Sequence, residues 1–214
     1  MPLYTTEALI LRSYALGESD RIVVFLTRDH GKKRGVAKNA RQSRRRFGGA
    51  LEPLTCGRVA YVERERHDLV RIDYVEQTRS PLSATDLEAL GYVGYFAELI
   101  DEWAPEADPN ESLFRLGASM VEAMATGVPI DPLARYFEYW LMRLQGVYEP
   151  DERLSAEAKT FLAAARISSP VMLGEVMVSM PVLRELEAAH RVLIARHLEK
   201  DLKSARVLRE MKRS

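Results

Sequence analysis

The chain has very little cysteine and no long apolar run. Its 214 residues include one cysteine, Cys56, which cannot form an internal disulfide or supply a zinc site built from several thiols. No run approaches about 18 uninterrupted apolar residues, so no membrane-spanning helix is expected. The first residues lack a basic segment followed by an apolar one, so no secretory signal is expected. These absences favour a cytoplasmic protein without disulfides or bound zinc.

The common catalytic patterns are also missing. Gly31-Lys32 lacks the glycine spacing of a phosphate-binding loop. His190 and His197 are seven residues apart, whereas metal proteases use two histidines four apart with a glutamate. Asp20 and Asp29 lack a third carboxylate at a spacing that a nuclease metal site would need. We therefore expect no enzymatic activity, no catalytic residue, no metal and no cofactor.

Charge is balanced overall but is unevenly distributed. Lys and Arg number 31, as do Asp and Glu. Residues 1–79 hold 16 basic and 10 acidic side chains, 80–152 hold 3 and 14, and 153–214 hold 12 and 7. Such segregation indicates a positive N-terminal part that faces an anion, followed by an acidic middle.

Hydrophobic periodicity divides the chain into two parts. Short β-branched or alternating runs within the first 80 residues, such as Ile22–Leu26 and Val70–Tyr74, predict five strands of a small barrel or sandwich. After Pro81 the spacing becomes helical, as in Tyr92, Tyr95, Phe96 and Leu99. We expect an α+β protein with a β domain over 1–79 and an all-α domain over 80–214.

The most informative segment is a dense basic stretch at 28–46. It has nine basic residues and one acidic one. Lys and Arg displace counterions from nucleic-acid phosphates and give affinity that does not depend on base sequence. Tyr14, Phe47 and Tyr61 are candidate stacking partners for unpaired bases. The alternative interpretation is a solvated charge run without a ligand. The predicted phosphate-binding residues are Lys32, Lys33, Arg34, Lys38, Arg41, Arg44, Arg45 and Arg46.

Two arginines in the acidic middle form a second candidate site. Arg135 and Arg143 are two of only three basic residues within 80–152. They either pair with nearby carboxylates or receive an acidic or carboxyl-terminal peptide from a partner.

The order of several motifs resembles the bacterial DNA repair protein RecO family. The N-terminal match includes Gly17-Glu18-Ser19-Asp20-Arg21 and the run from Phe47 to Pro53, although the family usually has glycine at the position of Asn39. Weaker matches follow at 95–99, at 135–141 leading to Gly146, and at 197–206.

This resemblance implies an N-terminal OB-fold barrel, a C-terminal helical domain and a non-enzymatic recombination mediator. Such proteins bind single- and double-stranded DNA, anneal complementary strands and act with RecR. They engage the acidic C-terminal tail of single-strand-binding protein, and they help RecA to load at gaps. The resemblance carries the tail-binding role to Arg135 and implies a location at the nucleoid.

The chain departs from many members at one place. Many insert a four-cysteine zinc module after the third helix, but here Gly146–Pro150 runs almost directly into Leu154. Zinc is therefore not expected, and the surface that the module would supply is missing. Two other functions stay open: an RNA-binding OB-fold protein, and a protein-interaction adaptor whose basic segment contacts acidic partners.

Overall fold

The computed structural model describes residues 2–63, 68–83 and 87–211. Five strands form a closed barrel in the order β1-β2-β3-β5-β4. They are β1 (Leu3–Leu16), β2 (Asp20–Thr27), β3 (Lys32–Ala37), β4 (Cys56–Val62) and β5 (Val70–Arg79). All neighbouring strands are antiparallel except β3 and β5, which are parallel. This is the OB-fold strand order, and the α+β class expected from the sequence is confirmed.

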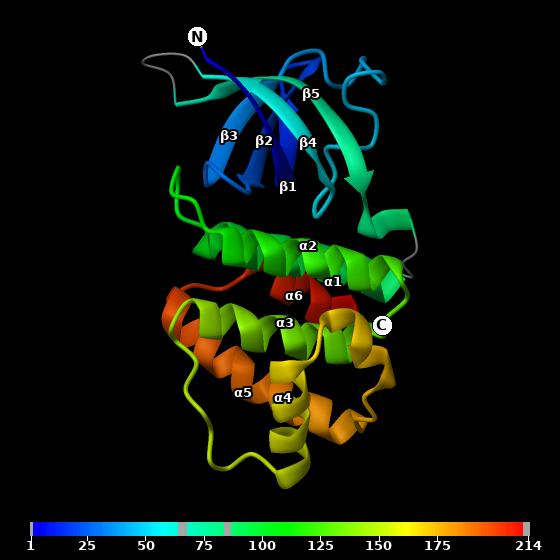
Figure 1. Ribbon diagram of the computed structural model, residues 1–214, viewed down its shortest axis with the longest axis vertical. Helices are drawn as coiled ribbons and strands as arrows, with labels where there is room; N and C mark the ends of the chain where they lie inside the picture. The colour runs from blue at the N-terminus through cyan, green and yellow to red at the C-terminus, as the bar shows by residue number, and fades with distance from the viewer. Residues whose placement is uncertain (1, 64–67, 84–86, 212–214) are drawn as a thin grey trace.

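Helices follow the barrel along the chain and lie beneath it in Figure 1. They are η1 (Pro81–Ser83), α1 (Leu87–Trp103), α2 (Glu111–Ala125), α3 (Ile130–Leu144), α4 (Ala156–Ile167), η2 (Pro170–Glu175), α5 (Met180–Leu198) and α6 (Lys203–Met211). Apolar side chains spaced three and four residues apart bury one face of each long helix, as Leu113, Leu116, Met120 and Met124 do in α2. Within the described ranges, no helix has the length and apolar character needed to cross a membrane.

The barrel is packed onto the helices through part of its outer face. Its interior has its own core, which includes Ile10, Phe25 and Ile72. Leu9 and Leu11, which alternate with that core, point outward and join the core of the helical domain. A side chain at Gly117 of α2 would collide with Leu9, so a glycine permits this close approach. Apolar burial on both faces of β1 therefore joins the two parts.

The turn between β2 and β3 rests on the loop that connects α1 and α2. Lys32 and Glu106 form an isolated parallel β-bridge, in which the amide of Ala107 donates to the carbonyl of Lys32 at 3.0 Å. Gly31 has a φ of +68°, and a side chain there would overlap the backbone of Asp108. The acidic middle of the sequence thus touches one end of the basic segment.

Candidate nucleic-acid interface

The basic segment continues past β3 as an arm, which we define as residues 38–55. The arm is fixed to the barrel because Phe47, Ala50 and Leu51 are buried in the barrel core. The amide of Val75 in β5 donates to the carbonyl of Arg46 at 2.9 Å. These contacts anchor the middle of the arm and leave its charged side chains on the outside.

The start of the arm is held by the turn between β1 and β2. The backbone amide of Asn39 donates to the Asp20 carboxylate at 2.8 Å, and this hydrogen bond is the main reason that the pKa of Asp20 is lowered. Asn39 has a φ of +53°, a left-handed conformation that asparagine tolerates better than most residues. The amide of Arg41 donates to the carbonyl of Ser19 at 3.1 Å. The arm and this turn therefore form one continuous surface.

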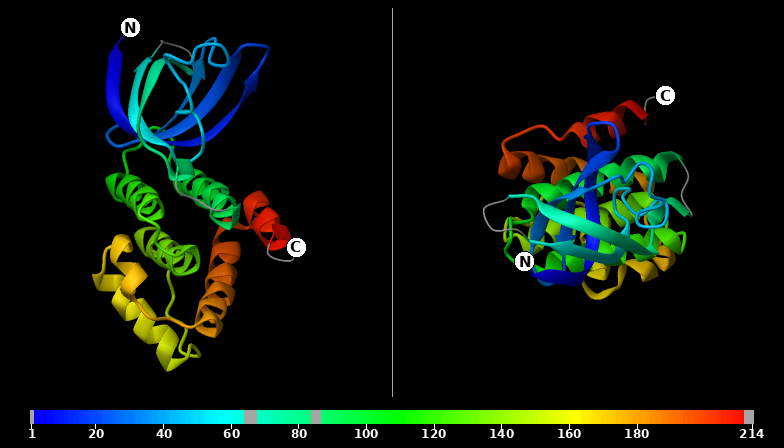
Figure 2. Two further views of the ribbon diagram at one scale, coloured as in Figure 1. Left: turned by 90° about the vertical axis from the view of Figure 1, so that its right-hand side faces the viewer. Right: turned by 90° about the horizontal axis from the view of Figure 1, so that it is seen from above.

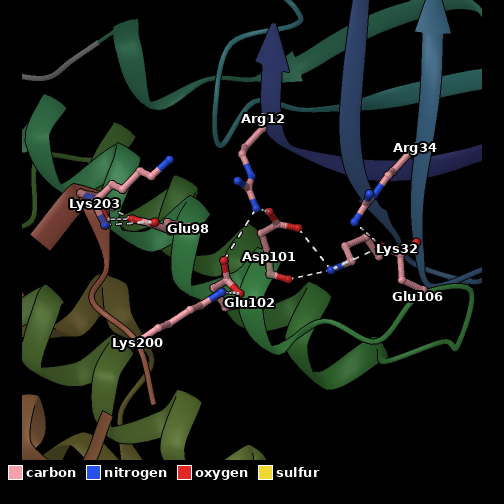
Figure 3. Close-up of polar contacts among 10 residues, drawn as sticks. Arg12, Lys32, Arg34, Glu98, Asp101, Glu102, Glu106, Lys200 and Lys203 are labelled. Carbon is pink, nitrogen blue, oxygen red and sulfur yellow. Dashed lines mark hydrogen bonds and ion pairs between the residues drawn. The ribbon is translucent and has the colours of Figure 1, made fainter. Parts of the chain in front are cut away.

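Lys32 does not lie on that surface. Its side chain is buried, and its Nζ donates to the carbonyl oxygen of Asp101 at 2.7 Å and lies 3.2 Å from Oδ1 of the same residue (Figure 3). Burial lowers the pKa of Lys32. Arg12 of β1 also contacts the Asp101 carboxylate. The prediction that Lys32 binds phosphate is therefore wrong. Its ammonium group links the barrel to α1.

Lys33 and Arg34 are also paired with carboxylates, but in more exposed positions. Lys33 Nζ lies 2.7 Å from Oε1 of Glu63, and Arg34 Nη2 lies 2.8 Å from Oε1 of Glu106. Exposed ion pairs contribute little free energy, so the Arg34 pair can exchange its carboxylate for another anion. Both side chains can contribute to an anion-binding surface only after losing an internal partner.

The other five predicted residues are not ion-paired in the described part of the chain, although the charge of Lys38 helps to lower the pKa of Asp20. Within the described ranges, no carboxylate lies at ion-pair distance from Lys38, Arg41, Arg44, Arg45 or Arg46. Arg46 Nη2 donates to the Lys38 carbonyl at 2.7 Å, and Arg41 Nη1 donates to the Glu18 carbonyl at 3.2 Å. A carbonyl partner orients a guanidinium but leaves its positive charge intact. The arm therefore presents oriented cations, which is the arrangement that polyanion binding requires.

Two of the three aromatic candidates for base stacking are wrong. Phe47 is 2% exposed and Tyr61 is fully buried in the barrel core, where it stacks on Tyr4. Tyr14 is 46% exposed on the outside of β1. Only Tyr14 of these three is therefore available to a base.

Arg135 is locked inside the helical domain. It is 3% exposed, and its Nη2 lies 3.1 Å from Oε1 of Glu138, whose other carboxylate oxygen lies 3.0 Å from Nδ1 of His190. Burial opposes ionisation of Glu138, but the charge of Arg135 together with the contacts from His190 and Tyr95 outweighs this effect, and the pKa of Glu138 is lowered. This geometry matches the interpretation in which Arg135 pairs with nearby carboxylates.

Arg143 is exposed and lies near a groove. Its Nη1 donates to the hydroxyl of Tyr139 at 3.0 Å, and its guanidinium lies 5.7 Å from the centre of the Trp140 ring. Trp140 also lines a groove of about 370 Å³ between α2 and α3, together with Arg115 and Leu144. The groove is therefore lined by one arginine, Arg115, and Arg143 lies next to it over the ring of Trp140.

Sequence patterns did not reveal the cluster that joins the two domains. Arg12 and Asp101 are 89 positions apart, so no local spacing connects them, although Arg12 ends the first stretch of the family resemblance. Lys200 contacts Glu102 at the far end of the same cluster (Figure 3). In the part of the chain that the structure describes, no group of three or more His, Cys, Asp or Glu side chains is placed to hold a metal ion.

The fold and the interface together define a class: an OB-fold barrel with a cationic arm, packed against a helical domain. Comparison with protein families agrees with this class. The family model described as "Recombination protein O N terminal" matches residues 1–81, and "Recombination protein O C terminal" matches residues 84–153. The chain belongs to the recombination protein O (RecO) family.

Several curated relatives are similar to this chain, and each is named "DNA repair protein RecO". The protein from Koribacter versatilis is 45% identical over 150 residues, which are 70% of this chain and 61% of the relative. That from Geobacter metallireducens is 42% identical over 142 residues, 66% of this chain and 57% of the relative. That from Anaeromyxobacter sp. strain K is 37% identical over 169 residues, 78% and 63% respectively. The chain thus spans about three fifths of the length of these relatives.

Proposed function

We propose that this protein is a DNA-binding mediator of recombinational repair that works without catalytic turnover. The proposal depends mainly on the arm cations at 38–46, which have no ion-paired carboxylate among the residues that the structure describes. The family and the names of the relatives supply the biological context of DNA repair. A protein in this role acts at the nucleoid.

Strand annealing follows from the same electrostatics. Two complementary strands repel each other through their phosphates, and a cationic surface that holds both lowers this repulsion and raises their local concentration. Base pairing then supplies the specificity, so the protein needs no contact with base edges. Single- and double-stranded DNA both bind, because each presents phosphates.

The salt dependence of DNA binding tests this proposal. If the arm contacts about four to six phosphates, log K falls against log salt with a slope of roughly −3 to −5. The Arg44→Ala/Arg45→Ala variant removes two side chains at the tip of the arm. It should weaken binding to every sequence alike and flatten the slope by about 1.5 to 2.

A matched control removes the same amount of charge elsewhere. Arg166, Arg184 and Arg206 are exposed on α4, α5 and α6. Replacing two of them with alanine changes the net charge equally and should leave the slope unchanged. An equal loss in both variants would show that net charge matters and the arm does not.

Two other functions predict different results. An RNA-binding protein would prefer an RNA oligonucleotide in direct competition with DNA of the same sequence. An adaptor would give no shift of DNA in a gel at moderate salt. Either result would replace the DNA proposal.

The partners we propose are RecR, the tail of single-strand-binding protein and, indirectly, RecA. Their support is the family resemblance, with one addition from the geometry. The groove lined by Trp140 has apolar walls and one lining arginine, Arg115, with Arg143 beside it, whereas Arg135 is already paired. We therefore propose that the groove takes the acidic tail.

A fluorescent peptide with an acidic sequence and a free carboxyl terminus tests the proposed tail site. Its anisotropy should rise with the wild-type protein and rise much less with Arg143→Ala. Unchanged binding in that variant would remove Arg143 from the site. Loading of RecA onto coated single strands, with and without RecR, tests the mediator role itself.

A further inference from the structure

The turn between β1 and β2 places an acidic side chain beside the cationic arm. The β1–β2 hairpin rises away from the helices (Figure 2), and Asp20 is the first residue of β2. A carboxylate at this position repels phosphates and, by its charge alone, weakens the binding of a polyanion to the arm. Asp20 therefore favours DNA binding only if it has a second effect that outweighs this repulsion.

The contacts of Asp20 hold the chain where it turns after β3. Its Oδ1 accepts from the backbone amide of Asn39 at 2.8 Å and from the hydroxyl of Ser19 at 3.1 Å. Asn39 has a φ of +53°, and its carbonyl accepts from the amides of Gln42 and Ser43 at 3.1 and 3.0 Å. The Asp20 carboxylate is thus bonded to the residue around which the first part of the arm is folded.

Two backbone carbonyls of the same turn hold Arg41. The Ser19 carbonyl accepts from the amide of Arg41 at 3.1 Å, and the Glu18 carbonyl accepts from its Nη1 at 3.2 Å. Among these three acceptors, only that of Asp20 belongs to a side chain. A substitution of Asp20 therefore removes one link between the turn and the arm and leaves the backbone of the turn unchanged.

We propose that Asp20 is a positioning residue, which fixes the arm in its DNA-binding conformation without touching DNA. A flexible arm must be ordered when it binds, and this ordering costs free energy that a preformed arm avoids. The hydrogen bond to Asn39 then contributes more to binding than the repulsion between the carboxylate and the phosphates takes away. This inference rests on the proposed DNA binding by the arm and assigns the residue that preorganises it.

The direction of the change in affinity separates positioning from charge. Labelled oligothymidine is titrated with the full-length protein and its variants, and anisotropy is followed. Asp20→Ala removes both the negative charge and the acceptor. It should weaken binding by about twofold to tenfold, the range expected for the loss of one hydrogen bond. The slope of log K against log salt should stay unchanged, because the same phosphates are contacted.

Two variants of the same turn are the matched controls. Glu18→Ala removes an equal charge from an exposed side chain and leaves the carbonyl that holds Arg41 in place. It should bind DNA as tightly as the wild type or more tightly, because only repulsion is lost. Asp20→Asn removes the charge but keeps an oxygen that can accept from Asn39, so it should restore at least the wild-type affinity.

Limited digestion with trypsin reports the position of the arm in the absence of DNA. Trypsin cleaves after lysine and arginine, and a loosely held segment is cleaved faster than a fixed one. Cleavage within residues 38–46 should be faster in Asp20→Ala than in the wild type, and it should be unchanged in Asp20→Asn and Glu18→Ala. Asp20 is partly exposed, so we expect all variants to fold, and circular dichroism verifies this.

Three results would overturn the proposal. If Asp20→Ala bound oligothymidine as tightly as Glu18→Ala does, Asp20 would contribute only its charge. If Asp20→Asn bound as weakly as Asp20→Ala, the acceptor would not be what matters. Equal rates of digestion in all four proteins would show that the arm keeps its position without Asp20. Failure of the proposed function is distinct, because then the wild type itself does not bind oligothymidine, and the inference fails with it.

Discussion

Lys32 lies within the most basic stretch of the sequence, yet its replacement should reduce stability and spare DNA binding. Lys32→Met removes the buried ammonium and keeps an unbranched apolar stem of similar length. The substitution deletes a hydrogen bond to the carbonyl of Asp101 and an ion pair with its carboxylate. Removing one member of a buried pair costs about 3–5 kcal/mol when the remaining charge has no partner.

The actual cost should be smaller because a second cation remains. Arg12 still contacts the Asp101 carboxylate, so that charge keeps a counterion. We expect a loss of about 2–3 kcal/mol, close to the value of hydrogen bonds to charged groups. For a protein of this size, each kcal/mol lowers Tm by about 2–4 °C. The expected decrease is therefore about 4–12 °C.

Thermal unfolding and DNA binding are measured on the same samples. Lys38→Met is the matched control, because Lys38 is exposed and carries the same charge. It should unfold as the wild type does and bind DNA more weakly, which is the opposite pattern. Combining Lys32→Met with Asp101→Asn should cost less than the sum of the two single changes. A Lys32→Met protein with wild-type Tm and weakened DNA binding would refute the assignment.

Two further predictions concern the helical domain. Arg135→Ala should lower the free energy of unfolding in urea by about 3–5 kcal/mol, because the buried carboxylate of Glu138 loses its ion pair with the guanidinium of Arg135. If stability were unchanged and peptide binding were lost, Arg135 would instead be a partner-binding residue. Burial opposes ionisation of Glu98, but hydrogen bonds from Ser204 and Lys203 at the start of α6 outweigh it and lower the pKa of Glu98 below 4.5. A carboxyl with a lowered pKa stabilises the fold above its ordinary pKa, and that stability is lost as pH falls through the lowered value. Glu98→Gln should therefore have a lower Tm than the wild type at pH 7, and the gap should close in acid; a gap that persists at low pH would contradict this.

Local patterns were sufficient to predict the fold class. The alternation of Val70 and Ile72 with their neighbours reflects one face in the barrel core and one outside, and this depends only on residues two apart. The expected alternation fails at Tyr74, which is 39% exposed, because Val75 takes the next core position. Helical spacing in Tyr92–Leu99 depends on residues three and four apart. The sequence alone did not show that β1 runs for 14 residues and takes part in both cores.

The candidate site was predictable only in outline. Charge density located the arm, but whether a cation is compensated depends on residues distant in the chain. The partner of Lys32 is 69 positions away, and that of Lys33 is 30 away. Phe47 illustrates the same difficulty for apolar groups, since an aromatic residue among arginines is equally compatible with stacking on a base and with anchoring a loop.

The placement of acidic residues explains why a chain of zero net charge can present a cationic surface. Glu106 and Glu111 follow α1, and they pair with Arg34 and Arg28 at the end of the barrel that faces the helices. The acidic middle block thus neutralises the barrel where the two parts meet. The arm emerges elsewhere on the barrel, where the partners of Arg41 and Arg46 are backbone carbonyls. Because opposite charges neutralise each other where the barrel contacts the helices, the positive potential of the N-terminal part is concentrated on the arm. The arm is therefore the part of the barrel that attracts a polyanion most strongly.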